Sequence, residues 1–307
     1  MLTSFFGKST PVNIIAVVIF MAAFFVFANF DPLIADFNLL PFLEKLAVLV
    51  IFLLSVLVLN FIAQKNELTK RSAYKILLFA VFATSFPALL KNDQAIIANF
   101  FILLSFRRII SLKSRKVVQK KIFDATFWIC IASLYYFWSI LFLIVVFAGI
   151  VFYAAYIKNF LIPIIAFLAV ALVTECAYLL VYESFYHFSD WFQPMNFQFE
   201  NYQDLALLVP LSIILAVLIW TMFFYFSVIQ KASITRRPVL NLVMLSLGTA
   251  ICIAMLSHNK NGSEFIFFFV PLSIIASNYF GNKKDRIFKE ILLLLLILMP
   301  LCIPFIF

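Results

Sequence analysis

Two aspartates follow the first long apolar run of this 307-residue chain, in the segment NFDPLIADFN. Because Pro32 does not continue a helix, Asp31 is expected at the end of an apolar helix and Asp36 in the loop beyond it. A carboxylate placed there could bind a metal or act as a general base on an acceptor. The alternative interpretation is a pair of solvated loop acids with no chemical role.

A third carboxylate, Glu175, lies inside an apolar run at about residues 159–182. An ionisable group within a bilayer costs a few kcal/mol on insertion scales, so a functional role is the default hypothesis. The alternative is a buried glutamate that fixes helix packing through hydrogen bonds. The candidate catalytic residues are therefore Asp31, Asp36 and Glu175.

A polar segment late in the chain, SHNKNGSEF, holds His258, Lys260 and Glu264. A lysine beside a histidine could hold a phosphate as a point charge, which makes these three residues candidates for binding a substrate phosphate. The alternative is a polar hairpin turn, because Asn-Gly is a turn signal.

The elements that must position these residues are membrane helices. Hydrophobic residues make up 65% of the chain, against about 45–50% in a soluble domain, and the mean hydropathy is +1.11. We expect an all-α, polytopic transmembrane bundle that forms one integral membrane domain over residues 1–307. Its net charge of +9 lies in loops between apolar runs, which indicates contact with anionic membrane lipids rather than nucleic acid.

Four cysteines lie inside apolar runs, without a CxxC pair or a Cys/His cluster, so we expect neither a metal site nor a disulfide framework, and no cofactor. They are Cys130, Cys176, Cys252 and Cys302. The first apolar run, Val12 to Phe30, is too long for a cleaved signal peptide and is expected to be a retained first span.

Charge predicts how the chain is threaded. A threading with eleven passes and a cytoplasmic N-terminus places 20 of the 23 Lys and Arg residues inside, as the positive-inside rule requires. The tally depends on residues 123–156, which could cross once or twice. One crossing gives 13 basic residues inside and 10 outside, so two short helices that turn near Tyr136 are preferred. With spans at about 76–90 and 95–106, they make two consecutive short hairpins.

Two loops have distinctive composition. Residues 182–202 are rich in Phe, Tyr and Trp and are expected to lie along the outer interface as an aromatic belt, or to cap a cavity. Residues 107–121 carry seven basic residues and no acid. This basic loop either anchors on anionic lipid or docks a cytoplasmic partner.

The chain resembles, over essentially its full length, an uncharacterised family of multi-span inner-membrane proteins of flavobacteria and their relatives. The residues that carry the resemblance are FFGKSTPVN, AQKNELTKRSAYK, RRIISLKS followed by KIFDATFW, and SHNKNGSEF. The resemblance implies a multi-pass protein of the bacterial cytoplasmic (inner) membrane, and it implies no activity.

The order of elements also resembles the membrane core of the GT-C glycosyltransferases: one span, an acidic outer loop, short hairpins and a late polar outer loop running into FFFVPLS. Those enzymes take sugars from polyprenyl-phosphate carriers at the outer face. By that resemblance Asp31 or Asp36 would match the catalytic acid, and His258 and Lys260 would hold the carrier phosphate. The first outer loop is much shorter than in that family, and no soluble outer domain is present.

Three functions follow. A transferase acting on a lipid-linked sugar predicts an outward cavity that collects Asp31 or Asp36, Glu175, and His258 or Lys260. A non-enzymatic subunit or assembly factor of a cell-envelope complex, with a membrane-protein partner, predicts no such convergence and a flat apolar flank. A transporter is less favoured, because no inverted repeat and no Gly/Pro-broken helix pair is visible in the sequence.

Overall fold

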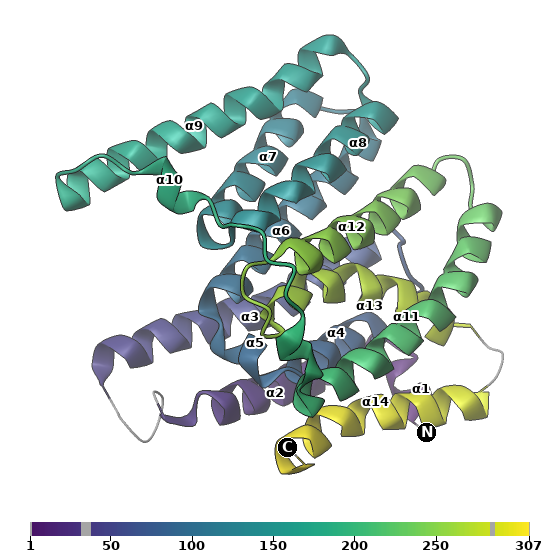
Figure 1. Cartoon of the computed structure of the whole chain (residues 1–307). Coiled ribbons are helices and arrows are strands. Elements are labelled where there is room, and N and C mark those ends of the chain that lie inside the picture. The colour runs from purple at the N-terminus through teal and green to yellow at the C-terminus, as the bar shows by residue number, and fades with distance from the viewer. Residues whose placement is uncertain (1, 32–37, 283–285, 307) are drawn as a thin grey trace.

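The computed structural model describes residues 2–31, 38–282 and 286–306, the side chains of 304–306 excepted, and in this part of the chain all regular structure is helical. This agrees with the all-α prediction (Figure 1). In chain order the helices are α1 Leu2–Phe6, α2 Pro11–Ala28, α3 Leu39–Lys65, α4 Tyr74–Thr84, α5 Pro87–Lys91, α6 Asp93–Ser111, α7 Val118–Tyr135, α8 Leu143–Tyr153, α9 Ile157–Tyr182, α10 Phe188–Trp191, α11 Leu205–Lys231, α12 Arg237–Leu256, α13 Ile266–Phe280 and α14 Arg286–Ile306, with short 3-10 helices η2 Leu112–Ser114, η3 Phe137–Phe142, η4 Glu200–Gln203 and η5 Ser263–Phe265.

Seven of the described helices are long and apolar enough to cross a membrane: α2, α3, α6, α9, α11, α12 and α13, with α6 and α13 counted together with their adjoining 3-10 turns. About 20 apolar residues suffice for one crossing. The chain is therefore a multi-pass membrane protein. Helices α4, α7, α8 and α14 occupy the places of the other four predicted passes, and the total of eleven crossings stays a prediction.

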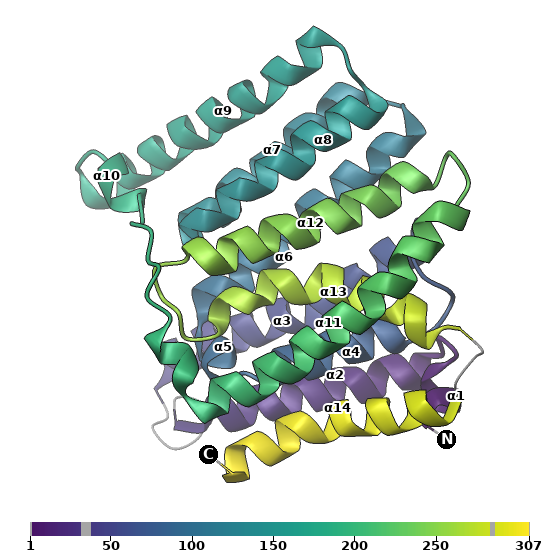
Figure 2. The same ribbon diagram turned by 45° about the vertical axis from the view of Figure 1, so that its right-hand side comes forward.

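The long helices run side by side, with α9 at one edge of the bundle and α14 at the other (Figures 1 and 2). Figure 2 shows α1, the α8–α9 and α11–α12 connections, the end of α13 and the start of α14 at one end of the bundle. We call this the basic end, because in the predicted threading the loops on this side carry most of the Lys and Arg residues. The opposite end, which we call the acidic end, holds the α9–α11 connection and the loop between α12 and α13. The positive-inside rule predicts that the basic end is cytoplasmic.

Helix α13 forms the core of the bundle. It packs against α4, α11 and α12, and its span is 100% buried, whereas the span in α9 is only 11% buried. Helix α9 packs mainly against α7 and α8, so most of its apolar surface faces outward. In a membrane protein such a surface is covered by lipid or by another protein.

The predicted turn within residues 123–156 is present. Helix α7 ends at Tyr135, Tyr136 adopts an extended conformation, and η3 begins at Phe137. The prediction of two short hairpins is only partly right, because α6 has 19 residues and α7 has 18. The sequence prediction counted only uninterrupted apolar residues, whereas α6 also takes in polar residues at both of its ends.

Asparagine side chains bind backbone carbonyls at helix ends and in the connections between helices. The last carbonyls of a helix have no partner within that helix, and glycine, the usual terminator, occurs only 5 times in this chain. An asparagine amide can supply the missing donor. Such amides donate from Asn13 to the Phe5 and Lys8 carbonyls, from Asn29 to Leu90, from Asn66 to Ile62, from Asn159 to Ala154 and from Asn278 to Leu68, at 2.6–3.1 Å.

The threading predicts the sidedness of single cysteines placed in a background without the four native ones. His258 and Ser114 are both exposed and lie at opposite ends of the bundle. We expect His258→Cys to react with a membrane-impermeant maleimide in intact cells, and Ser114→Cys to react only after the membrane is permeabilised. Labelling of Ser114→Cys in intact cells, with His258→Cys protected, would reverse the predicted orientation.

Candidate functional site

A buried carboxylate organises the acidic end of the bundle. Glu264, in η5, has 0% of its surface exposed. The Tyr202 hydroxyl donates to its Oε1, and the Gly262 N–H donates to both oxygens, at 3.0 Å and 3.2 Å. Burying a carboxylate is unfavourable unless such donors replace water. The carboxylate is thus held by partners from its own loop and from the segment that precedes α11.

Tyr202 is the donor that sequence reasoning did not identify as part of this site. Burial, and then the nearby Glu264 carboxylate, raise the pKa of the Tyr202 phenol. The phenol therefore stays protonated and can donate its hydrogen bond. Only its position in the aromatic loop 182–202 marked it in the sequence, and nothing there distinguishes it from the other aromatic residues.

Gly262 sets the geometry of the loop. Its φ of +94° lies in a region that L-residues rarely adopt. A Cβ at this position would also lie 3.0 Å from side-chain atoms of Leu207 and Phe86. The Asn-Gly pair is thus a turn, as one of the two interpretations expected, and the turn directs the Gly262 N–H at Glu264.

Lys260 is 2% exposed and does not face open space. Its ammonium donates to the Met255 carbonyl at 2.8 Å and to the Ala254 carbonyl at 3.2 Å. It also lies 4.2 Å from the centre of the Phe199 ring. Burial lowers the pKa of this ammonium, and the Glu264 carboxylate opposes part of that shift. A cation favours the C-terminal end of a helix, so Lys260 caps α12.

The segment between α10 and α11 covers this loop. The Asn196 side chain donates to the His258 carbonyl at 3.0 Å, while the imidazole of His258 is exposed. Beneath the loop, the Ser257 hydroxyl donates to the Asn259 carbonyl at 3.0 Å and hydrogen-bonds the Tyr136 hydroxyl at 2.6 Å. The α7–η3 turn is thereby attached to the end of α12.

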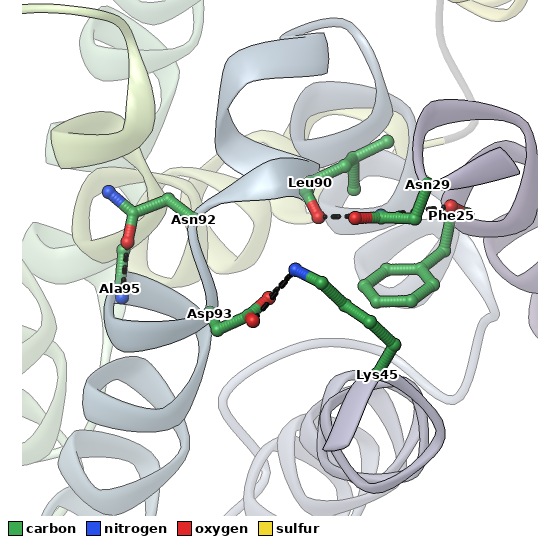
Figure 3. A network of polar contacts seen from close by, with 7 residues as sticks. All are labelled: Phe25, Asn29, Lys45, Leu90, Asn92, Asp93 and Ala95. Carbon is green, nitrogen blue, oxygen red and sulfur yellow. Dashed lines mark hydrogen bonds and ion pairs between the residues drawn. The ribbon is translucent and has the colours of Figure 1, made fainter. Parts of the chain in front are cut away.

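The short helix α5 connects the exit of α2 with the loop between α12 and α13. The Asn29 amide, just beyond α2, donates to the Leu90 carbonyl at 3.0 Å (Figure 3). Two residues further on, the Asn92 amide donates to the Ser263 hydroxyl at 2.9 Å. The exit of α2 and the loop that holds Glu264 are therefore anchored on the same five-residue helix.

An ion pair lies next to α5. The Lys45 ammonium, from α3, is 2.7 Å from both carboxylate oxygens of Asp93, the first residue of α6 (Figure 3). An acid in the first turn of a helix is also stabilised by the helix dipole. The pair leaves Lys45 engaged within the protein.

The predicted site residues thus fall into three places. Lys260 and Glu264 lie together, with His258 on the same loop. Asp31 is exposed directly beyond α2, and Asp36 lies outside the described residues. Glu175 stands apart on α9, where the Tyr186 N–H donates to Oε1 at 3.3 Å and Oε2 is buried without a hydrogen-bond partner.

No three His, Cys, Asp or Glu side chains come close enough to hold a metal ion within residues 2–31, 38–282 and 286–303. The polar side chains described at the acidic end mostly bind one another or backbone carbonyls. Their arrangement fixes the loops between the helices.

The fold and this site define an all-helical, multi-pass membrane protein with an internally hydrogen-bonded cluster at its acidic end. Residues 3–306 match the family described as "Family of unknown function (DUF6427)", and the chain belongs to that family. The prediction of an uncharacterised family is consistent with this match. No curated protein and no solved structure matches the chain.

Removing the Tyr202 hydroxyl should destabilise the acidic end. Tyr202→Phe removes the side-chain donor to the buried Glu264 carboxylate and leaves only the Gly262 N–H, and a lost hydrogen bond to a charged group typically costs about 1–3 kcal/mol. We expect a lower Tm in detergent for this variant, measured by thermal unfolding. Tyr182→Phe is the matched control, since Tyr182 is 63% exposed. Equal Tm values for the two variants would show that the Tyr202–Glu264 bond contributes nothing.

Two glycines provide a matched pair for the turn. Gly262→Ala should destabilise the protein by about 1–3 kcal/mol, because alanine is strained at positive φ and its Cβ would press on Phe86 and Leu207. Gly248→Ala, within α12, meets nothing within 4 Å and should be neutral or stabilising, by up to about 1 kcal/mol. Thermal unfolding of both variants tests the difference, and a Gly262→Ala protein as stable as wild type would contradict it.

Proposed function

We propose that this protein is a non-enzymatic membrane subunit or assembly factor of a cell-envelope complex in the bacterial inner membrane. One observation carries the proposal: two of the charged groups that would serve a transferase at the acidic end, Lys260 and Glu264, are bound inside the protein. The Lys260 ammonium binds backbone carbonyls, and the Glu264 carboxylate binds Tyr202 and Gly262.

The distribution of cations supports this proposal. The threading places three basic residues at the acidic end: Lys45, Lys91 and Lys260. Lys45 is paired with Asp93, Lys260 is buried, and Lys91 is exposed. An enzyme that stabilises a phosphate group uses cations that already point at the ligand. Two of the three cations here bind protein groups instead: Lys45 binds Asp93, and Lys260 binds the end of α12.

The exposed apolar flank supports it as well. The segment 183–204 beyond α9 has four acids, no Lys or Arg, and large apolar side chains that are well exposed: Phe185 by 71%, Phe192 by 58% and Phe197 by 61%. Apolar patches of this kind mark contact surfaces for proteins or membranes. The acids would favour a partner with a basic surface.

A second candidate function is the GT-C-like transferase, which takes a sugar from a polyprenyl-phosphate carrier. It is favoured by the anchoring of both outer loops on α5, which places exposed Asp31 on the same end as the 258–264 loop. In that reaction the acceptor hydroxyl would attack the sugar carbon and pass its proton to the Asp31 carboxylate, while the carrier phosphate leaves. Lys260 would first have to release the carbonyls of α12.

A complementation experiment in the native host separates the two functions. The double variant Asp31→Asn, Asp36→Asn should retain full function if the protein is a subunit, because neither carboxylate then does chemistry. In parallel, a photo-crosslinking residue at Phe192 should give one stoichiometric protein adduct. The matched position is Ile19 on α2, 63% exposed within the membrane span, which should give none.

Loss of function in the double variant at normal protein levels, without a protein adduct at Phe192, would favour the transferase. Adducts of equal yield at both positions would show that the contact is not specific to the 183–204 segment. Either result contradicts the subunit proposal.

A further inference from the structure

The basic end of the bundle contains a cavity of about 620 Å³ between the ends of α3 and α6 and the start of α7. We call it the basic cavity. Its size falls in the range of small-ligand sites, about 300–1,000 Å³. Five basic side chains line it, together with one acid, Glu67, and one aromatic ring, Phe61. The five are Lys65, Arg107, Arg108, Lys113 and Lys121.

Within the described residues, only one of these five cations forms an ion pair. Arg108 is paired with Asp124 at 3.0 Å. Lys65 and Arg107 instead converge on one ring, with the ammonium 5.2 Å and the guanidinium 5.0 Å from the centre of Phe61. Two cations over one ring repel each other, and an anion between them would relieve the repulsion.

The Lys121 side chain also lines the basic cavity. Its ammonium donates to the Ser111 carbonyl at 2.7 Å and to the Ser114 hydroxyl. It comes from α7, whereas Lys65 ends α3 and Arg107 lies near the end of α6. The consecutive helices α6 and α7 and the more distant α3 therefore all direct positive charge at one cavity.

An apolar stripe begins at the same ring. Phe61, Leu57, Leu54 and Val50 follow one another at intervals of four, three and four residues, so they share one face of α3. Each is 41–50% exposed. The stripe runs from the basic cavity along the membrane span of α3, and an acyl chain can lie on it.

We propose that the basic cavity binds the phosphate headgroup of an anionic lipid, whose acyl chain lies along Val50, Leu54, Leu57 and Phe61 of α3. The cavity supplies the charge complement and the stripe supplies the apolar contact. Basic pockets between helix ends on the cytoplasmic side are suited to such headgroups. Free inorganic phosphate shares the headgroup chemistry but does not use the stripe.

The positive-inside rule accounts for basic residues at this end, but not for their convergence. It requires only that Lys and Arg lie in the loops. Lys116 and Lys231 satisfy the rule as exposed side chains that do not line the basic cavity. They therefore provide a control of equal charge.

The test is lipid binding by native mass spectrometry of the full-length protein in detergent, with phosphatidylglycerol and phosphatidylcholine added in equal amounts. We expect wild type and Lys116→Gln/Lys231→Gln to prefer phosphatidylglycerol. Lys65→Gln/Arg107→Gln should lose at least about fivefold of that preference, since one cation near a membrane surface is worth about that factor. If the double variant does not fold, Lys113→Gln removes one exposed cavity cation and should reduce the preference in part.

Equal lipid preference in wild type and in Lys65→Gln/Arg107→Gln would overturn the proposal, as would equal losses in the cavity and control variants. A parallel arm adds millimolar inorganic phosphate without lipid and measures Tm. Stabilisation of wild type but not of the cavity variant, without a preference for phosphatidylglycerol, would assign the cavity to free phosphate and overturn the lipid assignment. Binding of phosphatidylglycerol with no effect of phosphate supports the proposal.

Discussion

A backbone carbonyl that is buried at a helix end or in a connection has no water to bind, so another part of the protein must supply a donor. This constraint governs how the helices are joined here. Asparagine amides donate to carbonyls at helix ends along the chain, and some of these bonds reach distant segments. Asn278 of the core helix α13 holds the Leu68 carbonyl in the α3–α4 connection, and Asn29 holds the Leu90 carbonyl in α5. The same bonds that satisfy the backbone therefore fix which helices are neighbours.

The arrangement of the acidic end follows from that constraint. Pro87 separates α5 from α4, and the resulting short helix leaves Leu90 and Asn92 available to the exit of α2 and to Ser263. Once Ser263 is fixed, the turn at Gly262 directs its N–H at Glu264, and the carboxylate in turn holds Tyr202. The buried Glu264 side chain is thus supported by two segments of the acidic end, and it keeps both of them in place.

The sequence was most informative where the distribution of charged residues determines the structure. The count of Lys and Arg on each side favoured a break near Tyr136, and α7 does end at Tyr135. The core could not be predicted in this way, because lipid and a protein interior are equally apolar. Helices α13 and α9 are both strongly apolar, yet the first is wholly buried and the second is largely exposed.

The site was predictable only in part, for the same reason. Lys260 and Glu264 are charged residues in an apolar chain, and their types marked them in the sequence. Their burial, and the donor Tyr202, depend on contacts between segments about 60 residues apart, which neither spacing nor composition encodes. Lys260 caps α12 because the last carbonyls of that helix, those of Ala254 and Met255, lie within hydrogen-bonding distance of its ammonium.

The cations discussed at the two ends of the bundle differ in what they contact. At the acidic end Lys45 and Lys260 are bound by protein groups, so an anion arriving there would have to displace existing bonds. At the basic end Lys65 and Arg107 converge on an open cavity with one acidic residue in its lining. Binding an anion at the basic end breaks no internal ion pair of these two residues, whereas binding at Lys260 requires the end of α12 to be uncapped. These contacts favour the basic cavity over Lys45 and Lys260 as the anion site that we propose, and they are consistent with the proposed basic or apolar partner for the 183–204 segment.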